Sequence, residues 1–115
     1  MNIDLETAIR ANEPPSKIAV LAAGYGDGIH RSLGNKGNVL VNGVLAPIVG
    51  IISMDVTMAD VTDVPDVALG DIVTIYGPDG HGNLLAANLV ARSIGTVTSD
   101  LLCAVSARVL RIYKA

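Results

Sequence analysis

The segment Gly24-Tyr25-Gly26-Asp27-Gly28 brings together the residue types with most chemical potential in this chain, a phenol and a carboxylate among glycines. A glycine-rich loop that follows a strand can hold phosphate through its backbone N–H groups. Such loops also need a Lys-Ser/Thr pair and a helix that begins directly after the glycines. Neither follows Gly28, so the segment predicts a tight turn at the end of a strand rather than a nucleotide site.

The acidic and imidazole side chains are of the types that bind metal ions, but their spacing does not fit a known site. The sequence lacks a twelve-residue calcium loop with a central glycine and a terminal glutamate. His30 and His81 have no cysteine partners at zinc-ligand spacing. We therefore predict no metal site, and expect solvated carboxylates at strand ends for Asp55, Asp60, Asp63, Asp66 and Asp71.

The remaining nucleophiles and bases do not form a known catalytic set. His81 lies between two glycines, which is typical of a turn, and Cys103 lies in an apolar stretch where we expect a buried thiol. Two histidines do not suffice to predict a Ser-His-Asp or Cys-His arrangement. His30 and Arg31 follow the glycine loop directly, so they could present positive charge to a cleft.

Charge and hydropathy exclude several classes of partner. The net charge is −3 and no basic cluster is present, whereas binding to nucleic acid needs a cationic face. The apolar run Ile18–Ala23 is far shorter than the roughly 20 residues that span a bilayer. The N-terminal residues do not resemble a signal peptide, and one cysteine cannot form an internal disulfide. We expect a cytoplasmic protein without nucleic-acid or membrane partners.

Strand patterns dominate the first two thirds of the chain. Asn42-Gly43 between two apolar arms predicts a type I′ hairpin over 39–46. Residues 1–17, which include Pro14-Pro15, indicate a loop or an edge connection. Ile18–Ala23 reads as a strand that is buried on both faces. Further strands are expected over 48–52, 56–61, 72–76 and 108–113.

Helical periodicity occurs only near the C-terminus. Leu85, Leu89 and Val90 recur at helical spacing, with Asn83 able to cap the start and Gly95 the end. A shorter helical turn is expected over 99–104. Several short strands with tight turns are typical of a closed sheet. The sequence thus predicts an all-β fold, a closed antiparallel Greek-key-like barrel with one or two short helices near the C-terminus.

Ordered blocks over residues 18–113 carry a family resemblance. The segment 22–28 followed by Arg31 is similar to a Gly-Tyr-Ala/Gly-Asp-Gly stretch, and 33–43 resembles the stretch that comes next. The segments 46–50 and 53–58, the latter Ser-Met-Asp-Val-Thr-Met, resemble a distinctive block of the same family. Residues 61–71, 94–96 and 106–111 continue in order. Together these blocks resemble the C-terminal domain of the alanine racemases.

The resemblance implies a pyridoxal-phosphate-dependent enzyme that interconverts L- and D-alanine for cell-wall peptidoglycan. In such enzymes an N-terminal (β/α)₈ barrel carries the cofactor and its Schiff-base lysine. Two chains pair head to tail, so each C-terminal domain completes the active site of the partner subunit. A lysine and a tyrosine act as bases on opposite faces of the substrate.

Residues 1–115 are accordingly expected to be a single domain, from which the N-terminal cofactor-binding barrel is absent. The chain alone should bind no cofactor and should not be active. Its expected partners are the barrel domain, a second subunit and a small amino acid. A domain that normally packs against a barrel should expose an apolar patch when isolated.

Family roles transfer to three matching residues. The resemblance implies that the backbone N–H of Met54 helps to hold the substrate carboxylate. It also implies that Tyr25 and Arg31 line the substrate entryway near the dimer interface. Judged by residue type alone, Tyr25 could be a half-buried turn residue and Met54 a core residue.

Three positions depart from the family pattern. The tyrosine base of the family falls on Glu6, nineteen residues before Tyr25, so no catalytic residue is assigned in this chain. Ile51 replaces an entryway arginine, and Ala107 replaces a tyrosine that reaches the cofactor phosphate. Two alternatives therefore stay open. One is a diverged racemase for a larger amino acid, with a wider entryway, and the other is a non-catalytic β-barrel that acts as an interaction module.

Overall fold

The computed structural model describes residues 2–10 and 16–112, and the side chains from residue 16 onward. Its longer strands are β1 (Asn2–Arg10), β2 (Ser16–Leu21), β3 (Asn38–Val41), β4 (Val44–Val49), β5 (Thr57–Asp60) and β6 (Ile72–Thr74). The 3₁₀ turns η1 (Tyr25–Asp27) and η2 (Arg31–Leu33) separate β2 from β3. A short hairpin of β7 (Gly77–Pro78) and β8 (Leu84–Leu85) leads to the helices α1 (Ala87–Ser93) and α2 (Thr98–Ala104).

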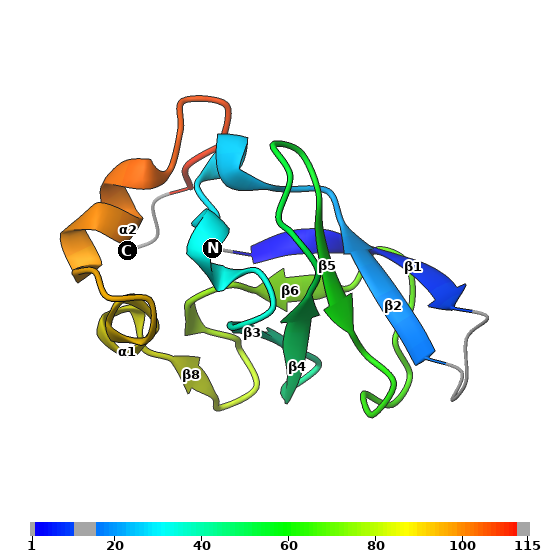
Figure 1. Ribbon diagram of the computed structural model, residues 1–115. Coiled ribbons are helices and arrows are strands. Elements are labelled where there is room, and N and C mark those ends of the chain that lie inside the picture. Colours follow the sequence, from blue (N-terminus) through cyan, green and yellow to red (C-terminus); the bar gives the residue numbers. More distant parts are fainter. Residues whose placement is uncertain (1, 11–15, 113–115) are drawn as a thin grey trace.

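Five antiparallel strands form a half-barrel in the order β2, β5, β4, β3, β6 (Figure 1). β2 lies beside β5 although β3 and β4 intervene in the sequence, which is the Greek-key arrangement. These five strands alone leave the sheet open between β2 and β6. β1 pairs with both edges, over 5–10 with β2 and over 2–4 with β6. The five-stranded sheet itself is thus an open half-barrel, which corrects the predicted closed barrel. β1 bridges its two edges, with different parts of the strand pairing with β2 and β6.

The predicted β-hairpin over 39–46 is confirmed. Asn42 and Gly43 link β3 to β4 with φ angles of 49° and 82°. A type I′ turn requires positive φ at both central residues, and Asn and Gly adopt it most readily. The prediction for β2 also holds, because the neighbours Ile18 and Ala19 point to opposite faces and are both buried.

Residues 2–10 form β1 rather than the predicted loop. The alternation of Ile3, Leu5 and Ile9 with polar residues is a strand signal. That signal was outweighed by Pro14-Pro15, which lie outside the described residues. The strand expected over 48–52 ends at Val49, because Gly50 has a φ of 78° that breaks the extended chain.

The C-terminal third also differs from the prediction in part. Helix α2 over 98–104 is confirmed, and Gly95 follows α1 with a φ of 75°, as a helix-ending glycine should. Asn83 does not cap α1, because it lies in the β7–β8 turn and donates to Asp79. Residues 108–112 form no strand, and Tyr113 lies outside the described part. Cys103 is exposed, since α2 buries only Leu101 among its residues.

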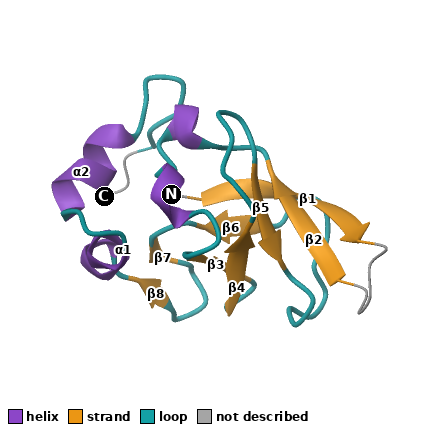
Figure 2. Ribbon diagram, viewed as in Figure 1, coloured by secondary structure: helices purple, strands orange, loops and turns teal. Residues whose placement is uncertain are grey.

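The hydrophobic core fills the half-barrel with branched and small aliphatic side chains, and α1 packs against it through Val90 and Ile94. Figure 2 shows both helices on one side of the molecule, away from the β1–β2 pair. Among the described residues no helix has the length and hydropathy to cross a membrane. The core residues are Ala19, Leu21, Ala23, Ile29, Leu33, Val39, Val41, Ala46, Ile48, Ile52, Ala59, Val61, Val64, Val73 and Ile75.

Candidate functional site

The glycine loop 24–28 and the segment 53–55 lie side by side at one end of the half-barrel. Leu21 at the end of β2 pairs with Thr57 at the start of β5, so the chain leaving β2 and the chain entering β5 meet at the same edge. The buried Thr57 hydroxyl strengthens this meeting by donating to the Ala23 carbonyl at 2.8 Å. The antiparallel register therefore positions the two segments that the family resemblance singles out.

Two backbone hydrogen bonds join these segments directly. The Tyr25 N–H donates to the Ser53 carbonyl, and the Gly26 N–H donates to the Met54 carbonyl, both at 2.9 Å. This approach requires glycine, because a Cβ added at Gly24 would lie 2.1 Å from the Ser53 oxygen. The predicted tight turn is confirmed, since residues 25–27 form a 3₁₀ turn.

Met54 and Asp55 form the tip of a short turn that Ser53 closes. The Ser53 hydroxyl donates to the Val56 carbonyl at 3.1 Å and accepts from the Val56 N–H at 3.0 Å. Within the described part of the chain, the N–H groups of Met54 and Asp55 donate to no acceptor. Met54 is 48% exposed, so it is not a core residue. Its backbone N–H is available to a ligand.

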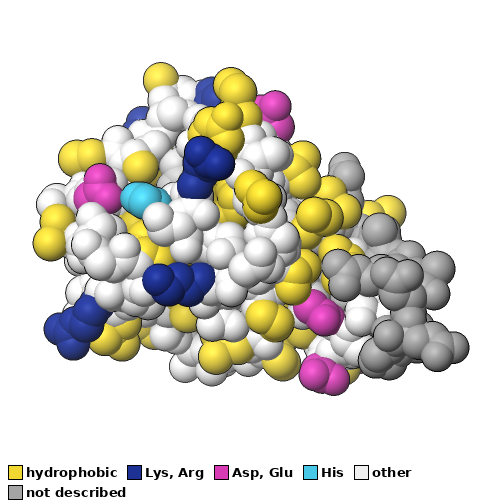
Figure 3. Space-filling view, in the orientation of Figure 1, with side chains coloured by type: hydrophobic (Ala, Val, Ile, Leu, Met, Phe, Trp, Pro, Cys, Tyr) yellow, Lys and Arg dark blue, Asp and Glu magenta, His cyan; other side chains and the backbone are white. Residues whose placement is uncertain are grey.

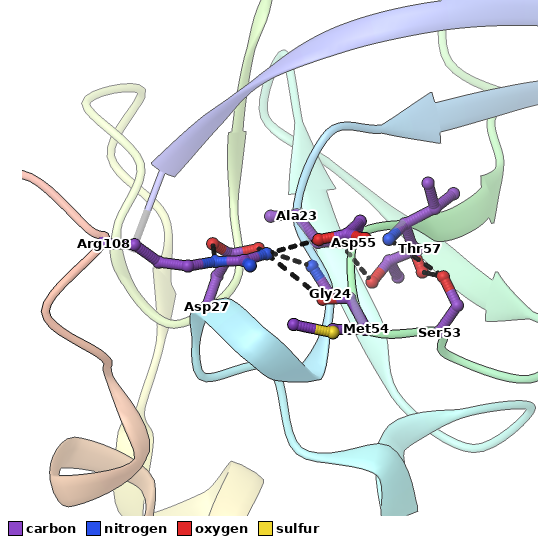
Figure 4. Close-up of polar contacts among 9 residues, drawn as sticks. Ala23, Gly24, Asp27, Ser53, Met54, Asp55, Thr57 and Arg108 are labelled. Carbon is purple, nitrogen blue, oxygen red and sulfur yellow. Dashed lines mark hydrogen bonds and ion pairs between the residues drawn. The ribbon is translucent and has the colours of Figure 1, made fainter.

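Arg108 reaches this site from the segment that follows α2 (Figure 4). Its guanidinium donates through Nε to Asp27 at 2.6 Å and through one terminal nitrogen to Asp55 at 2.7 Å. The same terminal nitrogen lies 3.1 Å from the second Asp27 oxygen and 3.4 Å from the Met54 carbonyl. Hydrogen bonds to Asp27 and then to Asp55 raise the pKa of Arg108 above its already high value.

Asp27 connects Arg108 to the glycine loop. One Asp27 oxygen also accepts from the Gly24 N–H at 2.9 Å, which closes the turn from within. The hydrogen bond from Arg108 is the main cause that lowers the pKa of Asp27 below its ordinary value of 3.8, against an opposing effect of burial. In the folded chain the Asp27 carboxylate is therefore ionised at every pH above 3.8.

Acid should weaken the domain partly through Asp27. A lowered native pKa means that the stabilisation is complete above the unfolded-state pKa near 3.8 and is lost as the pH falls through the lower native value. We expect Asp27→Asn to be less stable than wild type at pH 7, with a smaller further loss between pH 4 and pH 2. Urea unfolding at several pH values measures this. The exposed Asp63→Asn serves as control, and an unchanged pH dependence in Asp27→Asn would contradict the prediction.

Tyr25 and Arg31 lie next to each other on the rim of the site. The Arg31 guanidinium carbon stands 5.7 Å from the centre of the Tyr25 ring, within range of a cation–π contact. Tyr25 is 46% exposed on its turn. A shallow hollow of about 300 Å³ continues from Arg31 to the exposed Ile51, and its other lining residues are Ser32, Gly34, Asn35 and Gly50.

The other residues considered from the sequence take structural roles. The His30 Nδ1 accepts from the Ser32 N–H, and its Nε2 lies 3.5 Å from Asp100 on α2. His30 thus contacts the helix, whereas the neighbouring Arg31 lines the hollow. His81 lies in the β7–β8 turn, as predicted, and donates its N–H to Asp79. Over 16–112, no three His, Cys, Asp or Glu side chains are grouped to hold a metal ion.

Arg108 is the residue that sequence reasoning missed. In the sequence it belongs to the block 106–111 that resembles the family, and nothing in that block indicates a role for it. Its partners Asp27 and Asp55 are 81 and 53 residues away in the sequence, so no local spacing reveals the cluster. Ala107, its neighbour, is exposed. The side chain of Glu6 lies outside the described side chains, and the register places its backbone opposite Val20 on β2.

Comparisons with known proteins assign this mostly β half-barrel to the C-terminal domains of pyridoxal-phosphate-dependent isomerases. A family model described as "Alanine racemase, C-terminal domain" matches residues 6–113. The chain therefore belongs to the alanine racemase C-terminal domain family.

Individual relatives support the assignment. The chain is 46% identical over 96 residues to the alanine racemase of Geobacter sulfurreducens, which covers 84% of this chain and 25% of the relative. It is 48% identical over 98 residues to the alanine racemase of Methanococcus maripaludis, a match that covers 85% of this chain and 26% of the relative. The chain thus spans about a quarter of the length of these curated relatives.

Solved structures agree with the fold. The biosynthetic alanine racemase from Pseudomonas aeruginosa matches 99% of this chain and 34% of its own, with a TM-score of 0.86 and 31% identity. The alanine racemase from Bartonella henselae, described with covalently bound pyridoxal phosphate, matches 97% of this chain and 30% of its own, with a TM-score of 0.81 and 35% identity.

Proposed function

We propose that this chain is the C-terminal domain of an alanine racemase that interconverts L- and D-alanine, and that it completes the active site of a partner subunit. The observation that carries the proposal is the turn of the exposed residues Met54 and Asp55, whose N–H groups have no acceptor among the described residues. The Met54 N–H is a donor for the substrate carboxylate. Tyr25 and Arg31, in contact on the rim, line the path by which the amino acid enters.

The described residues of this chain do not offer a site that fits the cofactor. Pyridoxal phosphate needs a lysine for its aldehyde and a cradle for its phosphate. Lys36 borders a hollow of about 190 Å³ whose lining is half leucine and valine and contains no second cation. Lys17 lies near the start of β2, at the end of the strand away from the glycine loop, and its backbone N–H donates to Thr62. We propose that an N-terminal barrel outside this chain binds the cofactor.

A partner surface is supported by exposed hydrophobic side chains beside the site. Ile51, Met54, Val56 and Met58 are each at least one third exposed, although they lie within eight residues of one another. Figure 3 shows hydrophobic side chains reaching the surface of the face it presents, among Lys and Arg side chains. Such surfaces mark interaction sites. We propose that this one packs against the barrel domain and the second subunit.

A hybrid protein tests the proposed function. In this protein, called the core hybrid, residues 16–115 of this chain replace the equivalent stretch of the Geobacter sulfurreducens alanine racemase. The relative supplies everything that precedes it, including the position of the family tyrosine. We expect the core hybrid to racemise alanine, measured as loss of optical rotation of L-alanine. The matched control is the same relative truncated before that stretch.

Two outcomes would contradict the proposal in different ways. A folded, dimeric core hybrid without racemase activity toward any amino acid would favour a non-catalytic interaction module. Activity on a larger amino acid that exceeds activity on alanine would favour a diverged racemase. The exposed Ile51 beside Arg31 gives that second candidate its support, because the family arginine at this position is absent and the hollow is open.

A further inference from the structure

We propose that Arg108 is a positioning residue for carboxylate binding: it fixes the Met54–Asp55 turn and offsets part of the negative charge of Asp27 and Asp55, so that an anionic substrate can approach the Met54 N–H. This inference rests on the proposed function. It concerns a side chain that donates to acceptors on two segments, the glycine loop and the 53–55 turn.

The first step is the direction of the free N–H groups. The carbonyls of Ser53 and Met54 are consecutive, and both accept hydrogen bonds from the glycine loop. In a planar trans peptide the N–H points opposite to the carbonyl. The N–H groups of Met54 and Asp55 therefore both point away from the loop. Two successive N–H groups on one side form the type of concavity that binds anions.

The second step is what holds the second of these peptides. The Met54 carbonyl accepts from the Gly26 N–H at 2.9 Å, and an Arg108 nitrogen lies 3.4 Å from the same oxygen. A Cβ added at Gly26 would lie 3.1 Å from the guanidinium carbon of Arg108, so the guanidinium packs closely against the loop. Arg108 thus borders the peptide whose N–H belongs to Asp55.

The third step is charge. The Asp55 side chain belongs to the same turn as the free N–H groups and is largely exposed, whereas the Asp27 side chain is mostly covered. Without a cation, the carboxylates of Asp27 and Asp55 would lie beside the N–H groups that bind the substrate carboxylate, and would repel it. Arg108 contacts both, at 2.6 and 2.7 Å. A planar guanidinium can serve both at once, whereas an ammonium lacks the fixed fork geometry.

The backbone that precedes Arg108 packs against the glycine loop. A Cβ added at Gly28 would lie 2.7 Å from the Cα of Val105, so the segment after α2 runs against the glycine loop. The Ser106 N–H points to the Asp27 carbonyl at 3.5 Å. The 105–108 segment therefore follows the loop that bears Tyr25, and places Arg108 over its acidic partners.

The test uses the core hybrid and its variant Arg108→Gln. We expect the KM for alanine to rise about tenfold or more, with a smaller change in kcat, because carboxylate binding is weakened. The inhibition constant of acetate, a bare carboxylate probe, should rise in parallel. Adding Asp55→Asn to Arg108→Gln should recover most of the loss in both constants, since the exposed negative charge of Asp55 is removed and the net charge of the cluster returns to its wild-type value. Arg92→Gln, which removes an exposed arginine on α1, is the matched control and should change neither constant.

A purely structural role would give a different pattern. It would lower kcat or the melting temperature without raising the acetate constant, and Asp55→Asn would not restore binding; either result overturns the inference. Should Arg108→Gln not fold, Arg108→Lys takes its place, because it retains the charge. This variant is expected to raise the KM for alanine and the inhibition constant of acetate by a smaller factor. Unchanged values of both constants would count against the proposal. An inactive core hybrid overturns the proposed function itself. An active one in which Arg108→Gln changes nothing overturns this inference alone.

Discussion

Replacing Glu6 with tyrosine should raise kcat for alanine racemisation by about a hundredfold or more, because a positioned general acid–base group contributes roughly 10²–10⁴ in rate. The protein for this test is a whole-chain hybrid, in which all of residues 1–115 follow the barrel of the Geobacter sulfurreducens relative. Glu6 occupies the position that the resemblance assigns to the tyrosine base. A carboxyl with an ordinary pKa near 4.3 is a much weaker base than a phenolate, whose acid has a pKa near 10.

The register supports position 6 as the place for such a group. Glu6 pairs with Val20 on β2, one residue before the end of that strand, and β2 leads directly into the glycine loop. Glu6→Phe is the matched control, because it supplies the ring without the hydroxyl. Equal rates for the tyrosine and phenylalanine variants, or a wild-type hybrid as fast as the relative, would show that a phenol at position 6 is not what limits catalysis.

Gly24→Ala is expected to destabilise the chain by about 3 kcal/mol or more, since overpacking a tight site costs about 1–3 kcal/mol and occasionally more. The added Cβ would lie 2.1 Å from the Ser53 oxygen and 2.6 Å from the Met54 carbonyl carbon. Both obstacles are backbone atoms, so no side chain can move aside. The two segments must separate, and the hydrogen bond from Tyr25 to Ser53 would be lost with them.

Urea unfolding of the two single variants Gly24→Ala and Gly70→Ala separates this steric effect from ordinary glycine strain. Gly70 has a φ of 89° and nothing within 4 Å of an added Cβ. Its replacement should cost only the left-handed strain of alanine, about 1–2 kcal/mol. A loss in Gly24→Ala no larger than in Gly70→Ala would mean that the two segments are not held together as closely as described.

Local signals in the sequence predicted local structure well. Asn42-Gly43 specified its hairpin because positive φ at two residues is a local requirement, and Gly95 marked the end of α1 for the same reason. The alternation of Ile3, Leu5 and Ile9 also carried a strand signal, which the nearby prolines obscured. Cys103 was misplaced because α2 is amphipathic and shows its thiol to solvent.

The site depended on information that no local pattern contains. The neighbourhood of the glycine loop and the 53–55 turn follows from the pairing of β2 with β5, which is a property of the strand order and not of either strand. The family resemblance pointed to Tyr25 and Met54 without showing that they are joined through their backbones. Arg108 remained hidden because its acidic partners are brought to it only by the folded chain.

The pairing of β1 with both β2 and β6 has a consequence for the solubility of shortened forms of this domain. β2 and β6 are covered on their outer edges by one strand, so a polypeptide that starts at Ser16 with nothing before it would expose two rows of unsatisfied N–H and C=O groups. Exposed edges of this kind invite pairing with other chains. The trimmed domain should therefore aggregate edge to edge, and any strand supplied from elsewhere with matching register could take the place of β1.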